Sequence, residues 1–192
     1  ALTKIEKEAH VHFFNSHQNY QEVIKAAKTY RDATFIQRVD GPMRLYNHRL
    51  DPRDLIVFLL ARYVADGIIF QSDWSKRRLL ESGFRSNGTT ASCVIHNWAD
   101  DRIFFPEDRV AAFSDKKKIL IASWSTNRNK GFEIYKWLDK NLDFKRFIVE
   151  FVGNSPMEFQ NIQVIPPLPS RDLATKMRES DILLTASMND PC

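Results

Sequence analysis

The sequence alternates short apolar runs with longer amphipathic ones, and this alternation limits the folds that the chain can adopt. Runs with the length of strands lie at residues 10–14, 33–39, 67–70, 92–96, 117–122, 147–153, 162–169 and 182–187. Segments with helical spacing lie at residues 19–30, 51–65, 72–84, 130–141 and 170–181. Strands that alternate with helices of about 10–15 residues are typical of βαβ crossovers, so the pattern predicts an α/β protein built on parallel sheets.

Two of the runs, GIIF (67–70) and KILIA (118–122), are almost entirely apolar. Parallel strands of this kind are covered on both faces, so we expect helices on both sides of the sheets. Ligands of such sheets bind outside the carboxyl ends of the strands, and the loops that follow the strands are therefore the expected place for a site. The acid- and aromatic-containing segment from about residue 97 to 114 interrupts the alternation and marks the expected domain boundary.

The composition narrows the classes of function. Of the 192 residues, 43% are hydrophobic, which is enough for the core of one large or two small domains. The net charge is +4, but the 28 basic residues are scattered among 24 acidic ones, which favours anionic ligands or a membrane surface over a nucleic-acid-binding tail. Cys93 and Cys192 make no disulfide framework and indicate a reducing compartment. No apolar run reaches the roughly 18 residues of a membrane span, and the histidines lack metal-ligand spacing.

The most informative local motif is SWSTNRNKGFEIYKWL (123–138), in which a strand passes through a polar loop into a helix. The first N–H groups of a helix and its dipole attract phosphate, and Arg128 and Lys130 beside Gly131 would add charge-assisted hydrogen bonds to a diphosphate. From the residues alone, an ordinary solvated loop is the alternative. The motif has neither the glycine spacing of a P-loop nor the GxGxxG fingerprint.

Two further strand ends in the second half of the chain are candidate contact points. FVGNSP (151–156) places Gly153 and Asn154 after a strand, where glycine permits close approach of a ligand; a plain turn is the alternative. IPPLPSRDLA (165–174) is mainly a helix start, and the backbone of its loop at Pro167 and Leu168 offers contacts to a nucleobase.

Two strand ends in the first half carry polar side chains. In QRVDGP (37–42), Arg38 and Asp40 either bind anionic and hydroxyl groups of a ligand or pair with one another. Ser72 opens SDWSKRRLLESGF (72–84), where it either contacts a ligand or caps a helix that presents a solvated basic face.

In their order along the chain, DGIIFQSDWSKRRLLESGF, VIHNWADDRIFFP, KILIASWSTNRNKGFEIY, FVGNSP, IPPLPSRDLA and SDILLTASMNDPC resemble the motifs of the retaining family-4 glycosyltransferases of GT-B fold. HNWADDRIFFP is similar to the segment between that family's two domains, although Trp98 and Ala99 replace its usual Gly-Val. The resemblance implies two Rossmann-like parallel-sheet units of GT-B type, both incomplete. Residues 1–106 would be the latter part of the N-terminal acceptor-side domain, and residues 107–192 the first part of the C-terminal nucleotide-sugar-binding domain.

The resemblance also implies roles for individual residues. Lys130 matches the basic residue that contacts the donor diphosphate, and Arg128 is similar to its companion arginine at a shifted spacing; both would stabilise the leaving diphosphate. The implied donor-binding residues are Gly131, Gly153, Asn154, Pro167, Leu168 and Asp190, and the acceptor-side residues are Arg38, Asp40 and Ser72. Asp190 would take the first position of a motif of two glutamates, whose second lies beyond Cys192. The family's glycine-rich acceptor loop would precede residue 1.

The resulting hypothesis is a glycosyltransferase that moves a sugar, with retention, from a nucleoside-diphosphate sugar to a glycan or lipid-linked acceptor. We expect no metal and no cofactor, a cytoplasmic location, and leave open peripheral association with the inner face of a membrane. The alternatives are a non-catalytic α/β module that binds anionic partners, and an epimerase or phosphorylase of the same fold. A binding module requires one contiguous basic stripe, whereas the basic clusters at 76–78 and 116–118 lie on different elements, so no nucleic-acid partner is expected.

Overall fold

The computed structural model describes residues 9–47, 49–107 and 115–189, and these contain two four-stranded parallel sheets. The α/β fold predicted from the alternation is therefore confirmed. The chain forms two compact units. The first ends its main part at Asn97, and the second spans Trp98–Met188. The division into domains at residue 106 stays a prediction.

The first unit has its strands in sequence order, β1-β2-β3-β4. They are β1 (Val11–Asn15), β2 (Thr34–Val39), β3 (Gly67–Phe70) and β4 (Ala91–Val94). The helices are α1 (Tyr20–Thr29), α2 (Met43–Tyr46), α3 (Arg53–Tyr63) and α4 (Asp73–Glu81).

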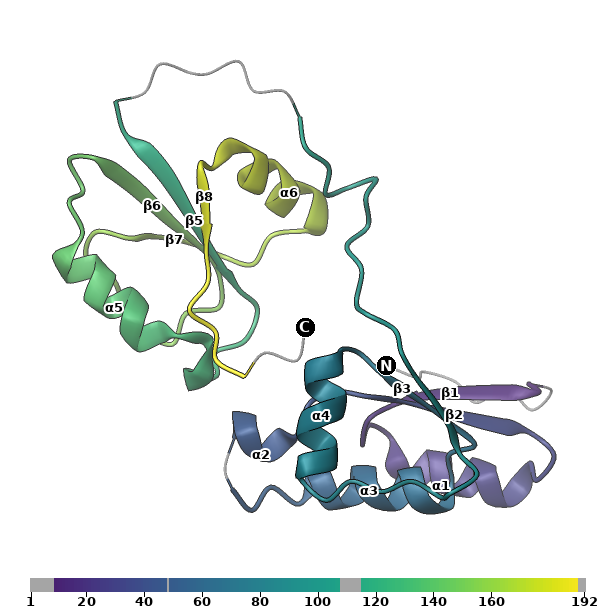
Figure 1. The fold of residues 1–192 in the computed structure, drawn as a ribbon. Helices are drawn as coiled ribbons and strands as arrows, with labels where there is room; N and C mark the ends of the chain where they lie inside the picture. Colours follow the sequence, from purple (N-terminus) through teal and green to yellow (C-terminus); the bar gives the residue numbers. More distant parts are fainter. Residues whose placement is uncertain (1–8, 48, 108–114, 190–192) are drawn as a thin grey trace. The chain divides into compact units, whose positions relative to one another are not determined.

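Because each crossover in this unit moves one strand in the same direction, right-handed connections place the helices on the same face of the sheet. Figure 1 shows α1 and α3 together on one side of β1, β2 and β3. Phe14, Phe35 and Phe70 point to that side and are buried in the core, whereas Val11 and Phe13 lie exposed. The expectation of helices on both faces therefore does not hold for the described part of this unit, because its strand order never reverses.

The second unit has the order β7-β6-β5-β8, so its strand order does reverse. Its strands are β5 (Lys117–Ser123), β6 (Phe147–Gly153), β7 (Gln163–Ile165) and β8 (Ile182–Leu184). Its helical elements are the short 3₁₀ helix η1 (Arg128–Lys130), α5 (Phe132–Asn141) and α6 (Ser170–Glu179).

Helices α5 and α6 cover opposite faces of this second sheet. Val149 of β6 lies in the core cluster that contains Phe132 and Tyr135 of α5. The next residue, Glu150, points to the other face, where Lys176 of α6 donates hydrogen bonds of 3.0 and 3.1 Å to its carboxylate. The prediction of helices on both faces is confirmed here.

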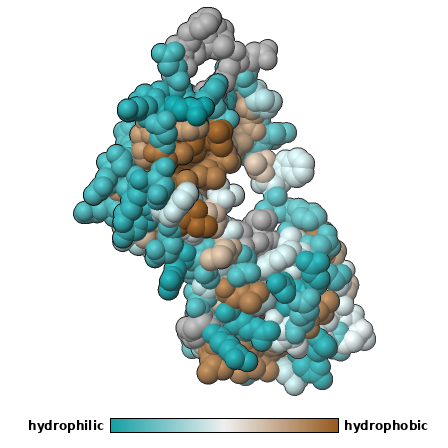
Figure 2. Space-filling model, turned by 60° about the vertical axis from the view of Figure 1, so that its left-hand side comes forward, coloured by the Kyte–Doolittle hydropathy of each residue, from teal (hydrophilic) through white to brown (hydrophobic). Residues whose placement is uncertain are grey.

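The α6 face is less completely covered than the α5 face by the residues that the structure describes. Leu183 of β8 is the register partner of Leu120 of β5 and is exposed, whereas Leu184 packs on the α5 side. Figure 2 shows a hydrophobic area on the surface of the second unit.

Candidate functional site

The strand order of the second unit defines where a ligand site is expected. The chain runs from β5 outward through β6 to β7 and then returns to the other side of β5 at β8. The strand order therefore reverses between β5 and β8, and the carboxyl ends of these two strands form a topological switch point, the usual ligand site of doubly wound sheets. The loop after β5 is the one that carries the cations predicted from the sequence.

Gly131 joins these two loops closely. Its φ of 87° is left-handed, and a Cβ atom on it would lie 2.5 Å from both Cβ and the carbonyl oxygen of Ala186 in the loop after β8. The Met188 N–H donates to the Asn129 carbonyl (2.7 Å), and the Ala186 N–H donates to the Tyr135 hydroxyl (2.9 Å). Glycine is thus needed at the mouth of α5 both for its backbone angle and for its lack of a side chain.

The mouth of α5 carries the two predicted cations on η1. Asn127 holds this turn by accepting a hydrogen bond from the Asn129 N–H at its side-chain oxygen (3.0 Å). Arg128 is exposed, and its guanidinium makes no ion pair or side-chain hydrogen bond with the described residues; Lys130 is half-buried. No side chain of the described residues caps α5. Cations therefore gather beside the positive end of a helix dipole, an arrangement that attracts an anionic group.

Gly153 ends β6 beside the end of β5. It has a φ of 133°, and a Cβ atom there would lie 1.9 Å from the Ser123 carbonyl oxygen. This approach allows the Asn154 N–H to donate to that oxygen (3.0 Å), while the Asn154 side chain donates to the Trp124 carbonyl (2.8 Å). Gly153 and Asn154 therefore position the start of the loop after β5. The structure shows this positioning role, and their contact with a ligand stays a prediction.

The remaining predicted donor-side residues lie apart from these contacts or outside the description. Pro167 is exposed and Leu168 half-buried in the loop between β7 and α6, which follows the carboxyl end of β7. Asp190 lies outside the described residues.

At the carboxyl edge of the first sheet, Arg38 is the centre of a polar network. Its Nη1 donates to Asn15 (2.9 Å) and to Asp40 (3.0 Å), and its Nη2 donates to Gln71 (2.5 Å) and Asn97 (2.7 Å). Each partner comes from the carboxyl end of a different strand. Asn15 ends β1, Asp40 follows β2, Gln71 follows β3 and Asn97 lies shortly after β4. Of the two interpretations of Arg38 and Asp40, the structure shows mutual pairing, and four acceptors occupy the Nη groups that would bind an anion.

Two titratable groups near this network have shifted pKa values. Burial raises the pKa of the Asp40 carboxyl, against the opposing effect of Arg38 and then of His17. Burial, followed by the charge of Arg53, lowers the pKa of His17. The buried Nδ1 of His17 has no hydrogen-bond partner among the described residues. Sequence reasoning missed His17, although its place just after the first strand was a usable signal.

Ser72 has a structural task in the first unit. Its hydroxyl oxygen accepts a hydrogen bond from the Ser75 N–H (3.1 Å) at the start of α4. This is the capping interaction that the sequence offered as the alternative to a ligand contact.

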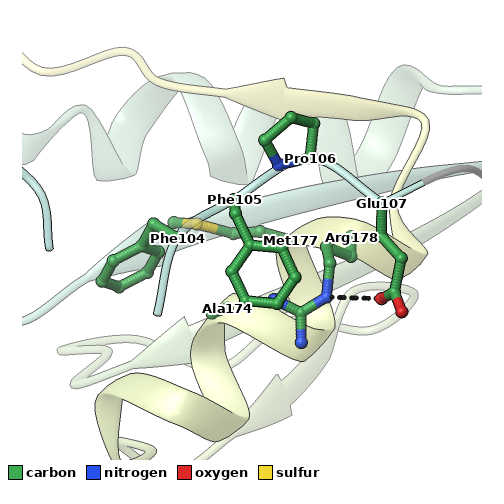
Figure 3. Close-up of a pocket in the computed structure, with 7 residues that line it drawn as sticks. All are labelled: Phe104, Phe105, Pro106, Glu107, Ala174, Met177 and Arg178. Carbon is green, nitrogen blue, oxygen red and sulfur yellow. Dashed lines mark ion pairs between the residues drawn. The ribbon is translucent and has the colours of Figure 1, made fainter. Parts of the chain in front are cut away.

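A separate surface pocket of about 320 Å³ lies within the second unit, between α6 and the segment at residues 104–107 (Figure 3). It is lined by Phe104, Phe105, Pro106, Glu107, Ala174, Met177 and Arg178. Arg178 donates to Glu107 (3.1 Å) and to the Ile103 carbonyl (3.2 Å), and its guanidinium lies 4.7 Å from the centre of the Phe105 ring. These contacts fasten the segment Ile103–Glu107 to α6, on the flank of the sheet and not among the strand-end loops.

The described residues contain no group of three or more His, Cys, Asp or Glu side chains suited to a metal ion. Among the helices in the described ranges, none combines the length and the apolar character needed to cross a membrane.

The two sheets, their parallel strands and their crossovers define a pair of Rossmann-like units of GT-B type. The structure is similar to chains of known structure, among them the apo structure of OtsA, with a TM-score of 0.62 and 11% sequence identity. The similarity covers 94% of this chain and 53% of the OtsA chain, so this chain spans about half the length of OtsA. At that identity the likeness concerns the fold alone. No protein-family model and no curated protein sequence matches the chain.

Proposed function

We propose that this chain is part of a GT-B glycosyltransferase that binds a nucleoside-diphosphate sugar at the carboxyl edge of the second sheet. The observation that carries the proposal is the cationic turn η1 at the mouth of α5, placed at the switch point between β5 and β8. The ordered motifs of the sequence, which resemble those of retaining family-4 enzymes, support the same assignment. We further propose that the sugar is transferred with retention to a glycan or lipid-linked acceptor, in the cytoplasm, and without a metal ion or cofactor.

In this proposal the protein acts mainly through electrostatics. Breaking the bond between the sugar and the diphosphate leaves negative charge on the leaving oxygen. The charge that develops on this oxygen would be stabilised by Lys130, Arg128 and the N-terminus of α5. Because these groups would bind the transition state more tightly than the intact substrate, they would lower the activation barrier. Gly131 contributes by letting the loop after β8 pack against this turn, so that the backbone that carries the cations is fixed before the substrate arrives.

The test is the substitution Lys130→Ala in the full-length protein, with Lys136→Ala as the matched control. Lys136 is an exposed lysine further along α5, away from the helix mouth. We expect Lys130→Ala to lower kcat on the protein's own sugar nucleotide by roughly 100- to 1,000-fold, the usual effect of removing a group that stabilises transition-state charge. Lys136→Ala should keep the wild-type rate.

The donor class is found first by calorimetric titration of the wild-type protein with UDP, GDP and ADP. Turnover of the matching sugar nucleotide is then followed by release of the diphosphate. An unchanged kcat for Lys130→Ala would contradict the assigned role of this residue. Failure of the wild-type protein to bind any nucleoside diphosphate would contradict the proposed function itself.

A further inference from the structure

Trp124 is the first residue after β5, and the residue is 76% exposed. Among the described residues, no aromatic ring and no cation stacks on this side chain. A large apolar ring held in water is unfavourable unless a partner covers it, and aromatic rings are well suited to cover flat faces of ligands.

The backbone around Trp124 is fixed, although its side chain is not covered. The Asn154 side chain donates to the Trp124 carbonyl (2.8 Å), and the Asn154 N–H donates to the Ser123 carbonyl (3.0 Å). On the other side, the Ser123 hydroxyl donates to the Ser125 carbonyl (2.8 Å). These contacts hold the residues on either side of Trp124, so little backbone freedom remains to be lost when the indole meets a ligand.

The position of Trp124 distinguishes it from the other strongly exposed tryptophans of the described residues. Trp98 (87% exposed) is the first residue of the second unit, remote in sequence from its strands, and Trp137 (61% exposed) lies within α5. Trp124 instead follows the strand end at which the order of the sheet reverses, four residues before Arg128. Ligands of doubly wound sheets bind at this edge.

We propose that Trp124 stacks on a ring of the donor substrate while the cations of η1 hold its diphosphate. This inference rests on the proposed function and extends it by naming the residue that recognises the part of the donor beyond the phosphates. The chemistry required is a ring with a flat, weakly polar face, which either the nucleobase or the CH face of the sugar supplies.

The experiment measures binding to the full-length wild-type protein and to Trp124→Ala, Trp124→Phe and the control Trp137→Ala. The probes are inorganic pyrophosphate, the nucleoside diphosphate that binds best among UDP, GDP and ADP, and a sugar nucleotide of that base. Calorimetry gives each Kd, and quenching of tryptophan fluorescence reports stacking directly. Circular dichroism checks that each variant is folded.

We expect Trp124→Ala to weaken binding of a ring-bearing probe by about 5- to 150-fold, as for loss of one base–aromatic stack. Trp124→Phe should keep most of the affinity, and Trp137→Ala all of it. Pyrophosphate should bind equally to all four proteins, because it has no ring. A loss already present with the nucleoside diphosphate assigns the stack to the base, whereas a loss that appears only with the sugar nucleotide assigns it to the sugar.

Two results would overturn the inference, and they are distinguishable. If the wild-type protein binds a nucleoside diphosphate or sugar nucleotide and Trp124→Ala binds both equally well, the stacking role is wrong and the proposed function stands. If the wild-type protein binds none of the ring-bearing probes, the proposed function is wrong and the stacking role fails with it.

Discussion

Replacing Gly153 by alanine tests how closely the ends of β5 and β6 must approach. The backbone φ of 133° at this residue is a conformation that other residues adopt at a cost of about 1–3 kcal/mol. The added Cβ would also lie 1.9 Å from the Ser123 carbonyl oxygen, where ordinary contact begins at 3.4 Å. The strand end must therefore move, and the hydrogen bond from the Asn154 N–H to that oxygen, a contribution of about 0.5–1.5 kcal/mol, is lost. The backbone and hydrogen-bond terms together predict a loss of about 1.5–4.5 kcal/mol in the free energy of unfolding of the second unit, and the displacement of the strand end adds to it.

Two other glycines separate the cost of the backbone conformation from the cost of the steric clash. Gly83 has a φ of 90° but open space around its Cβ position, so Gly83→Ala should cost only the backbone term, about 1–2 kcal/mol. Gly88 has neither a left-handed φ nor a neighbour within 4 Å, so Gly88→Ala should change stability by less than about 1 kcal/mol. The order of stability loss is therefore Gly153→Ala, then Gly83→Ala, then Gly88→Ala.

The assay is urea unfolding combined with native-state hydrogen exchange read by mass spectrometry. Exchange is needed because the two compact units have separate cores, and peptides from β5 and β6 report on the second unit alone. A loss for Gly153→Ala no larger than that for Gly83→Ala would refute the steric reasoning, since it would show that the ends of β5 and β6 separate at no cost.

Two further perturbations probe the rest of the second unit. Burial favours a raised pKa for the Asp139 carboxyl, but the N–H groups of Gln160, Asn161 and Ile162 outweigh it and lower that pKa. The carboxylate therefore stabilises the fold above its unfolded pKa of 3.8, and the advantage of wild type over Asp139→Asn in urea should shrink as the pH falls below that value; a constant difference down to pH 2 would contradict this account. Arg178→Met keeps an unbranched apolar stem but removes the guanidinium and its contacts to residues 103–107, so amide exchange there should accelerate about 5-fold, corresponding to about 1 kcal/mol. Arg171→Met is the control for this second change, and equal exchange in the two variants would show that Arg178 does not fasten the segment.

The strands and the longer helices could be predicted because their signals are local. Apolar periodicity and helix-start residues located each of the eight strands and the five longer helices near its observed position. The short helix α2 was missed, because its four residues are too few to show a period. It is capped from a distance: both carboxylate oxygens of Asp54 accept hydrogen bonds from the Met43 and Arg44 N–H groups.

The candidate site was only partly predictable, because some of its features are local in the sequence and others depend on contacts between distant residues. Arg128, Lys130 and Gly131 were identified because a strand, a polar loop and a helix start follow one another directly in the sequence. The pairing of Arg38 with Asp40 was one of two interpretations offered by the sequence, but Gln71 and Asn97 were not identified as partners, because they reach Arg38 from strand ends far along the chain. The exposure of Trp124 was equally hidden, since an apolar residue next to an apolar strand is ordinarily expected in the core.

The sequence by itself determined the α/β class, the parallel strands and the edge at which a ligand is expected, because these follow from periodicity and chain direction. Only the tertiary structure decided the strand order of each sheet, and hence that the first keeps its helices on one face while the second has a switch point. It also decided which glycines are indispensable: a Cβ atom would lie 2.5 Å from Ala186 if added to Gly131, and 1.9 Å from the Ser123 carbonyl oxygen if added to Gly153. Such contacts join residues that are distant in sequence, and a local pattern carries no record of them.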